Sequence, residues 1–104
     1  MDIQFSRLVH WYCGQCNGIW EHEHYGFLIK TMDNPALKLV VDLNGTKFEN
    51  VKFKTVERGL ESDDAWLTCE KTSDNRFEGY CSPNLIGELI GEFVAWTEEV
   101  SSDK

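Results

Sequence analysis

Residues 37–43 read Leu-Lys-Leu-Val-Val-Asp-Leu, and this short pattern sets the class of the whole chain. Its odd-numbered positions are all aliphatic, whereas Lys38 and Asp42 are charged and lie between them. Because successive side chains of a strand point to opposite faces of a sheet, the alternation predicts a half-buried strand with one face toward a core.

Further strand-like segments, separated by turn signals, lie on both sides of this one. Asp and Asn bond their own backbone and Pro fixes φ, so Asp33-Asn34-Pro35 predicts a turn before it. Asn44-Gly45 predicts a tight turn after it. The predicted strands are residues 24–31, 37–43, 51–55, 65–71 and 77–81. A polar loop is expected at residues 59–64 and a turn at residues 73–75.

An amphipathic helix is predicted at each end of the chain. In residues 3–16 the apolar side chains recur at helical spacing on one face, and Asp2 is a suitable N-cap. Near the other end, Ser82 is the expected N-cap and Pro83 the first helical residue. The apolar stripe of this second helix comprises Ile86, Leu89, Ile90, Phe93 and Val94, with Leu85 and Trp96 at its margins.

These elements predict an α+β fold. Short links between the strands imply an antiparallel meander, and two amphipathic terminal helices can cover one face of such a sheet. We therefore expect a single domain over residues 1–104, with an antiparallel sheet of four to five strands and the N- and C-terminal helices packed on it. The length agrees, since 104 residues with 41% apolar side chains are enough for one core.

Composition excludes several classes of protein. No apolar stretch approaches the ~20 residues that a membrane-spanning helix needs. No basic segment followed by an apolar run marks a signal peptide, so a cytoplasmic location is expected. The net charge of −8 argues against nucleic acids and anionic membrane surfaces as partners, because both attract Lys and Arg.

The acidic charge is concentrated in the second half of the chain. Residues 57–104 carry 12 acidic and 4 basic side chains, whereas residues 1–56 carry 6 of each. Such a concentration suits a basic partner, because it attracts that partner over long range. Solubility alone accounts for the same pattern equally well.

Residues 11–26 hold the densest group of chemically reactive side chains, and three interpretations compete for them. The first is zinc, since Cys13, Cys16, His22 and His24 are of the types that ligate it. Only five residues separate the two pairs, however, which is shorter than usual zinc-finger spacing. The second is redox chemistry at the cysteine pair, but the pair lies at a helix end whose dipole disfavours a thiolate.

The third interpretation is acid–base catalysis by residues 21–24, which alternate between Glu and His. The same alternation along a strand would place the carboxylates on one face and the imidazoles on the other. No Gly-rich phosphate loop or nucleophile motif occurs elsewhere. Reduced thiols are expected in the cytoplasm, and Cys69 and Cys81 should be small buried side chains.

At this segment the chain resembles a known family, the immunity protein 53 family of bacterial polymorphic toxin systems. The resemblance extends over residues 9–96 and is specific, because Trp-Glu-His, Tyr-Gly and Asp-Asn-Pro occur together in order. The chain departs from the family where Asn17-Gly18-Ile19 replaces the usual Asp-Gly-Asp. The matching residues are Trp11-Tyr12, Gln15-Cys16, Gly18, Trp20-Glu21-His22, Tyr25-Gly26, residues 31–35, Val41-Asp42-Leu43, Asp64-Ala65-Trp66, Cys69 and Asn84-Leu85.

The resemblance implies a cytoplasmic antitoxin that binds a cognate toxin domain and blocks it by occlusion, without catalysis, cofactor or metal. Such a mechanism uses a few anchor residues and charge complementarity, here toward a toxin that we expect to be basic. The predicted partner-binding residues are Trp20, Glu21, His22, Glu23, Asp33, Glu61, Asp63 and Asp64. The residues expected in the core are Trp11, Trp66 and Trp96. The alternative is a small zinc-binding or catalytic domain that uses Cys13, Cys16, His22 and His24.

Overall fold

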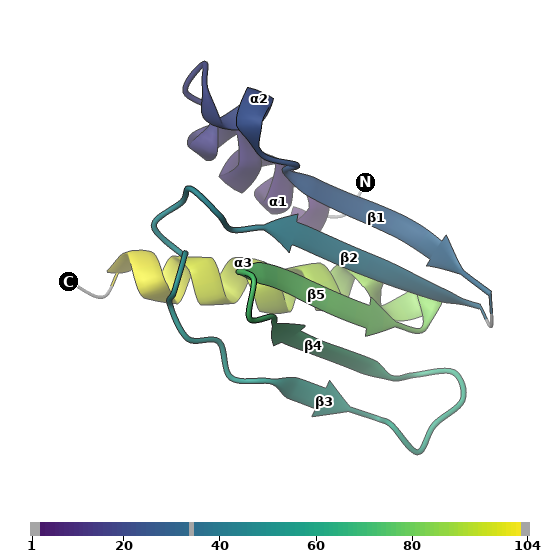
Figure 1. The fold of residues 1–104 in the computed structure, drawn as a ribbon. Helices are drawn as coiled ribbons and strands as arrows, with labels where there is room; N and C mark the ends of the chain where they lie inside the picture. The colour runs from purple at the N-terminus through teal and green to yellow at the C-terminus, as the bar shows by residue number, and fades with distance from the viewer. Residues whose placement is uncertain (1–2, 34, 103–104) are drawn as a thin grey trace.

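The computed structural model describes residues 3–33 and 35–102 and confirms the α+β class (Figure 1). Asp2, the expected N-cap, and Asn34 of the predicted turn lie outside the described residues. Within the described ranges, no helix has the length and apolar content that a membrane span requires. The elements are α1 (Ile3–Gln15), α2 (Trp20–Glu23), β1 (Phe27–Met32), β2 (Ala36–Asp42), β3 (Val56–Arg58), β4 (Leu67–Lys71), β5 (Arg76–Cys81), the 3-10 turn η1 (Pro83–Leu85) and α3 (Ile86–Ser102).

The strand order corrects the predicted meander. Neighbouring strands follow the order β1-β2-β5-β4-β3, and all of the pairs are antiparallel. Strand β2 therefore lies between β1 and β5, with Leu39 opposite Ile29 on one side and Gly79 on the other. After β2 the chain leaves the sheet, passes through residues 43–55 and returns at the far edge as β3 (Figure 1).

The strand predicted at residues 51–55 is wrong, because this segment is irregular and only residues 56–58 pair with β4. The alternation does describe the side chains, since Val51 and Phe53 pack against the core. The main chain is held by helix α3 instead, where Trp96 Nε1 donates a hydrogen bond to the carbonyl oxygen of Lys52 at 3.0 Å. This part of the backbone thus bonds to the helix and not to a neighbouring strand.

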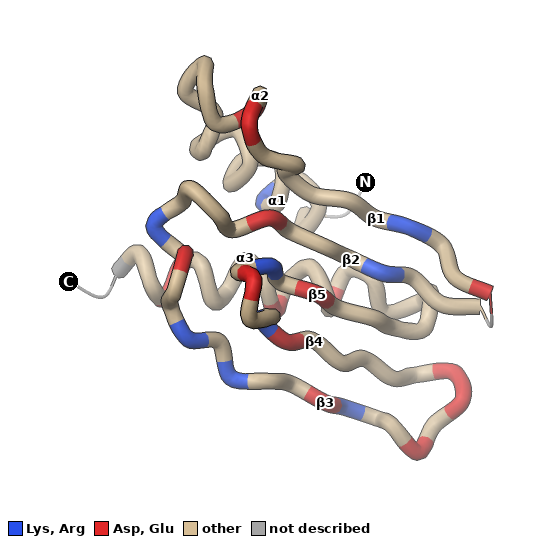
Figure 2. The backbone as a smooth tube through the Cα atoms, viewed as in Figure 1, with Lys and Arg blue, Asp and Glu red and all other residues tan. Residues whose placement is uncertain are grey.

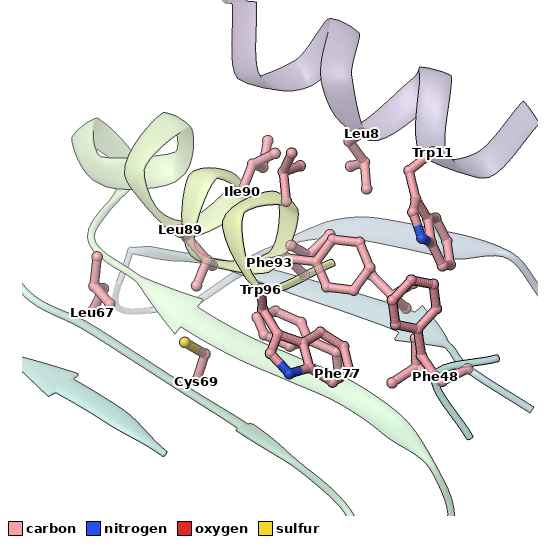
Figure 3. Close-up of a cluster of buried hydrophobic side chains, with 14 of the residues drawn as sticks. Leu8, Trp11, Phe48, Leu67, Cys69, Phe77, Leu89, Ile90, Phe93 and Trp96 are labelled. Atoms are coloured by element: carbon pink, nitrogen blue, oxygen red, sulfur yellow. The ribbon is translucent and has the colours of Figure 1, made fainter. Parts of the chain in front are cut away.

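The core lies between the sheet and the two long helices, and Phe93 of α3 is at its centre (Figure 3). The centroid of its ring lies 5.0 Å from those of both Trp11 and Phe77, and 6.1 Å from that of Trp96. Helices α1 and α3 and strand β5 therefore share one aromatic cluster. The stripe predicted for the C-terminal helix lies against this core, and Trp96, expected at its margin, is buried as well.

The beginning of the C-terminal helix differs from the prediction. Pro83 opens the 3-10 turn η1, and the Ser82 side chain does not cap it. The buried Ser82 hydroxyl instead accepts a hydrogen bond from the Trp66 N–H at 3.1 Å and bonds to the Trp66 carbonyl oxygen at 3.3 Å. Ser82 therefore ties the beginning of the helix to the residue that precedes β4. Trp66 itself is only half-buried, unlike Trp11 and Trp96.

We expect Phe93→Ala to lower the free energy of unfolding by about 3–5 kcal/mol, because it empties the centre of the aromatic cluster. Chemical denaturation monitored by tryptophan fluorescence measures the change. Ala95→Ser, at an exposed position of the same helix, is the control and should stay within ~0.5 kcal/mol of the wild type. Similar values for both variants would contradict the central position of Phe93.

Candidate functional site

Trp20, one of the predicted partner-binding residues, is a structural anchor. Its side chain is 4% exposed, and its indole N–H donates a hydrogen bond to the carbonyl oxygen of Asn44 at 2.9 Å. The ring stacks on His24, with centroids 5.8 Å apart and an interplanar angle of 27°. It also lies beside Tyr12 and at right angles to Trp11. Trp20 thus fastens α2 to α1 and to the turn after β2, and little of it faces solvent.

Glu21, the second predicted anchor, closes the turn that leads into α2. Its carboxylate accepts hydrogen bonds from the backbone N–H groups of Asn17 at 3.0 Å and Gly18 at 2.9 Å. In return, Asn17 Oδ1 accepts from the Trp20 N–H at 2.9 Å, so the two side chains cap the helical turn reciprocally. The pKa of Glu21 lies below the usual 4.5. The backbone N–H of Glu21 itself is the main cause, and the N–H groups of Asn17 and Gly18 add to it.

These caps correct the expected alternation over residues 21–24. Residues 20–23 form a helical turn, so the Glu and His side chains do not sort onto two faces of a strand. The turn begins at Asn17-Gly18-Ile19, where the family usually has Asp-Gly-Asp. Asn17 supplies a capping oxygen, which is the role for which Asp and Asn are both preferred at helix N-termini.

Asp42, at the end of β2, is the most constrained charged residue of this region. Its side chain is buried and accepts hydrogen bonds from the Tyr25 N–H at 3.1 Å, the Asn44 N–H at 3.0 Å and the Asn44 side-chain amide at 2.9 Å. His24 Nδ1 lies 3.7 Å from the same carboxylate. Burial by itself would raise the pKa of Asp42, but the hydrogen bonds from Asn44 and Tyr25 outweigh it, and the pKa lies below the usual 3.8.

The tight turn predicted at Asn44-Gly45 packs directly beneath the ring stack. Gly45 has a φ of +80°, and a Cβ atom placed there would lie 2.7 Å from His24 Nε2 and 3.1 Å from Trp20 Cδ1. Only glycine satisfies both the backbone conformation and the close approach. The residues around Trp20, His24 and Asp42 therefore form one hydrogen-bonded unit that joins α2 to the end of β2, and we call it the α2 hub.

The residues of the zinc alternative do not come together. Among the residues that the structure describes, no group of three or more His, Cys, Asp or Glu side chains could hold a metal ion. Cys13 is exposed, the Cys16 thiol donates a hydrogen bond to the Tyr12 carbonyl oxygen at 3.4 Å, and His24 faces Asp42. No observation in the described chain therefore favours this alternative.

The other two cysteines are buried, as predicted. Burial raises the pKa of the Cys69 thiol to about 12 and that of the Cys81 thiol to about 11. Both thiols therefore stay protonated at neutral pH and act as small apolar side chains.

The remaining predicted partner-binding residues lie at two opposite ends of the sheet. His22 and Glu23 are exposed on α2, whereas Asp33 is exposed in the turn between β1 and β2 at the other end (Figure 1). Three exposed carboxylates share that second end, in the loop between β3 and β4: Glu61, Asp63 and Asp64. The strands separate the two groups by about 20 Å, given their length. The structure thus does not bring the predicted residues into one patch.

Between these ends lies the uncovered face of the sheet, which the sequence did not single out as a site. Its side chains alternate with those that pack into the core, so they point away from both long helices. Figure 2 views the sheet from this side and shows acidic and basic positions together on β3 and β5, an acidic position on β4, and basic positions on β1 and β2, with an acidic one at the end of β2. We call this surface the open face; it comprises Leu28, Lys30, Met32, Lys38, Val40, Arg76, Glu78, Tyr80, Thr68, Glu70 and Glu57.

By its fold the chain is a small α+β domain whose helices cover one face of the sheet and leave the other open. The family model of immunity protein 53 matches residues 5–98, which is most of the chain. The chain therefore belongs to the immunity protein 53 family, and the resemblance seen in the sequence is confirmed. No curated protein and no solved structure shows a significant match to it.

The Asp42 carboxylate makes the stability of the domain depend on pH. Because its pKa is lowered in the folded state, the charge stabilises the fold above the usual carboxyl pKa, and this contribution is lost as the pH falls through the folded-state value. We expect Asp42→Asn to lower the free energy of unfolding at pH 7 by about 2–3 kcal/mol, because charged hydrogen bonds are lost. The variant should also lose less stability than the wild type between pH 5 and pH 3.

Urea unfolding at these three pH values measures both effects. Asp33→Asn, at an exposed site away from the α2 hub, is the matched control and should follow the wild-type curve. Parallel pH curves for wild type and Asp42→Asn would show that Asp42 is not the titrating group.

Proposed function

We propose that this chain is an antitoxin that binds a cognate toxin domain of a polymorphic toxin system in the cytoplasm and neutralises it by occlusion. The family match over residues 5–98 carries the proposal. The mechanism we propose is contact alone, with no reaction catalysed and no cofactor. A compact domain with a rigid aromatic core suits this role, since a preformed surface loses little entropy on binding.

The proposed contacts come from the exposed members of the predicted set. His22 and Glu23 project from the α2 hub, and four carboxylates project from the opposite end of the sheet: Asp33, Glu61, Asp63 and Asp64. Trp20 and Glu21 would contribute by holding α2 in place, because their side chains are engaged within the hub. The toxin is proposed to be basic, which agrees with the net charge of −8 and leaves nucleic acids and anionic membranes as poor partners.

Growth protection tests the proposed function. A candidate toxin domain from a neighbouring gene is expressed in a bacterium with and without the chain, and colony survival is counted. We expect the chain to restore growth, and a complex of the two proteins to survive gel filtration when the toxin is catalytically inactivated. Lack of both protection and complex would refute the proposal.

The carboxylates of the β3–β4 loop should act mainly on the rate of association. Exposed rim charges steer a charged partner over long range, and salt screens that attraction. We expect neutralisation of Glu61, Asp63 and Asp64 to slow association several-fold at low salt and to matter little at high salt. Binding kinetics against the inactivated toxin domain at two salt concentrations measure the effect, with melting curves as the folding control. A salt-independent rate for wild type and variant alike would exclude steering by this loop.

A further inference from the structure

The open face holds Lys30, Lys38 and Arg76, but its carboxylates on β3, β4 and β5 lie next to one another and form no ion pair with Lys or Arg among the described residues. Glu70 and Glu78 are directly opposite in the pairing of β4 with β5, and Glu57 of the next strand shares a shallow groove of about 210 Å³ with them. No Lys or Arg of the described chain forms an ion pair with any of the three. Like charges directly opposite each other destabilise a sheet, so this arrangement costs stability in the free protein.

The nearest arginines are directed elsewhere. Arg58 follows Glu57 in the sequence, but its guanidinium reaches the other side of the sheet and pairs with Glu92 of α3 at 3.0 Å. Arg76 on β5 belongs to the open face, and its Nε lies 3.9 Å from the Asp74 carboxylate. Arg58 and Arg76 thus have their ion pairs on α3 and in a turn, and Lys38 of the open face lies over the Tyr80 ring. The carboxylates of the open face are left to interact with solvent or with a partner.

An apolar groove adjoins these carboxylates, and it is an independent observation on the same face. It has a volume of about 470 Å³, and its lining includes Tyr25, Leu28 and Val40. Tyr25 is 86% exposed and Leu28 is 52% exposed, which are high values for large apolar side chains. Exposed apolar and aromatic side chains that gather in one groove are typical of protein-binding surfaces.

The groove and the carboxylates form one continuous row across the strands. Leu28 pairs with Val40, Val40 pairs with Glu78, and Glu78 pairs with Glu70. Adjacent strands are about 4.8 Å apart, so the apolar half and the acidic half of the row are centred about 10 Å from each other. A ligand that matches this row in an extended conformation carries an apolar side chain and, about three residues away, Lys or Arg.

We propose that the open face is the docking surface for the toxin domain, and this inference rests on the function proposed above. A basic, partly apolar segment of the toxin places its apolar side chain in the groove at Leu28 and Val40. Its Lys or Arg side chains pair with Glu70 and Glu78. The α2 hub and the β3–β4 loop, at the two ends of this face, then lie at the rim of the interface.

A second copy of the chain fits this face less well. Two copies turned about an axis along the strands would bring Lys30 and Lys38 of one onto the carboxylates of the other. Each copy carries a net charge of −8, however, so two copies repel each other over long range. The negative electrostatic potential that opposes self-association attracts a basic partner.

The test compares matched pairs of variants of the full chain in binding kinetics against the inactivated toxin domain encoded beside its gene. For charge, Glu70→Gln with Glu78→Gln is compared with Glu49→Gln with Glu98→Gln, which changes the net charge equally but lies off the open face. For the groove, Leu28→Ala is compared with Ile3→Ala, which removes an aliphatic side chain that is 72% exposed on α1, on the other side of the sheet.

We expect the Glu70/Glu78 variant to weaken binding about tenfold at low salt, and much less at high salt. The same variant should melt at a higher temperature than the wild type, because it removes a like-charge pair. Leu28→Ala should speed dissociation about tenfold, and both control variants should bind within about twofold of the wild type.

Three results would overturn the docking surface. One is that both open-face variants bind the toxin domain as tightly as the wild type does, which would leave the proposed function intact. Another is a lower melting temperature of the Glu70/Glu78 variant, which would make these carboxylates structural. The third is that the free wild-type chain sediments as a dimer and the Glu70/Glu78 variant as a monomer, because a second copy of the chain would then occupy the face. Failure of the wild type to bind the toxin domain would overturn the proposed function and this inference together.

Discussion

The buried charge of Asp42 is the constraint on which the α2 hub depends. A carboxylate removed from water is costly unless hydrogen bonds replace its hydration. Three N–H groups from Tyr25 and Asn44 do so here, and they come from both sides of β2. Satisfying this one group therefore fixes where the chain enters β1 and how it leaves β2. The stacked rings of Trp20 and His24 then pack against the backbone at Gly45.

The same constraint explains why the Trp-Glu-His motif reads differently in the sequence and in the structure. Trp and Glu are frequent in binding surfaces and equally frequent as anchors and caps, so residue type alone cannot separate the two roles. The contacts that decide between them join Trp20 to Asn44 and Tyr25 to Asp42. These partners are far apart in the chain, and nothing in the local pattern of residues 20–24 indicates them. The alternation of residues 37–43 directs Asp42 away from the core for the same reason, although an Asp side chain can bond the backbone N–H two residues on, as Asp42 does with Asn44.

The local sequence pattern was sufficient to predict an element wherever that element buries one face against the core. The strand at residues 37–43 and the apolar stripe of α3 were predictable, because their periodicity reports burial directly. The order of the strands was not predictable from local pattern, because it depends on which distant segment pairs with β2. Residues 51–55 illustrate the difference: their alternation correctly indicates which side chains are buried, but the Trp96 indole bonds the Lys52 carbonyl and no strand forms there. The periodicity of side chains thus predicts faces, whereas the backbone partners follow from tertiary contacts.

The division of charge between the two faces of the sheet follows from this architecture. On the covered side, acidic residues of α3 have basic partners: Glu92 pairs with Arg58, and Glu98 pairs with Arg7 of α1. On the open face, Glu70 and Glu78 oppose each other and have none among the described residues. If the acidic composition served solubility alone, directly opposed carboxylates would be unnecessary, because the same charge could be spread without cost. They lie beside an exposed apolar groove, and the basic partner proposed above would turn this unfavourable pair into a favourable contact.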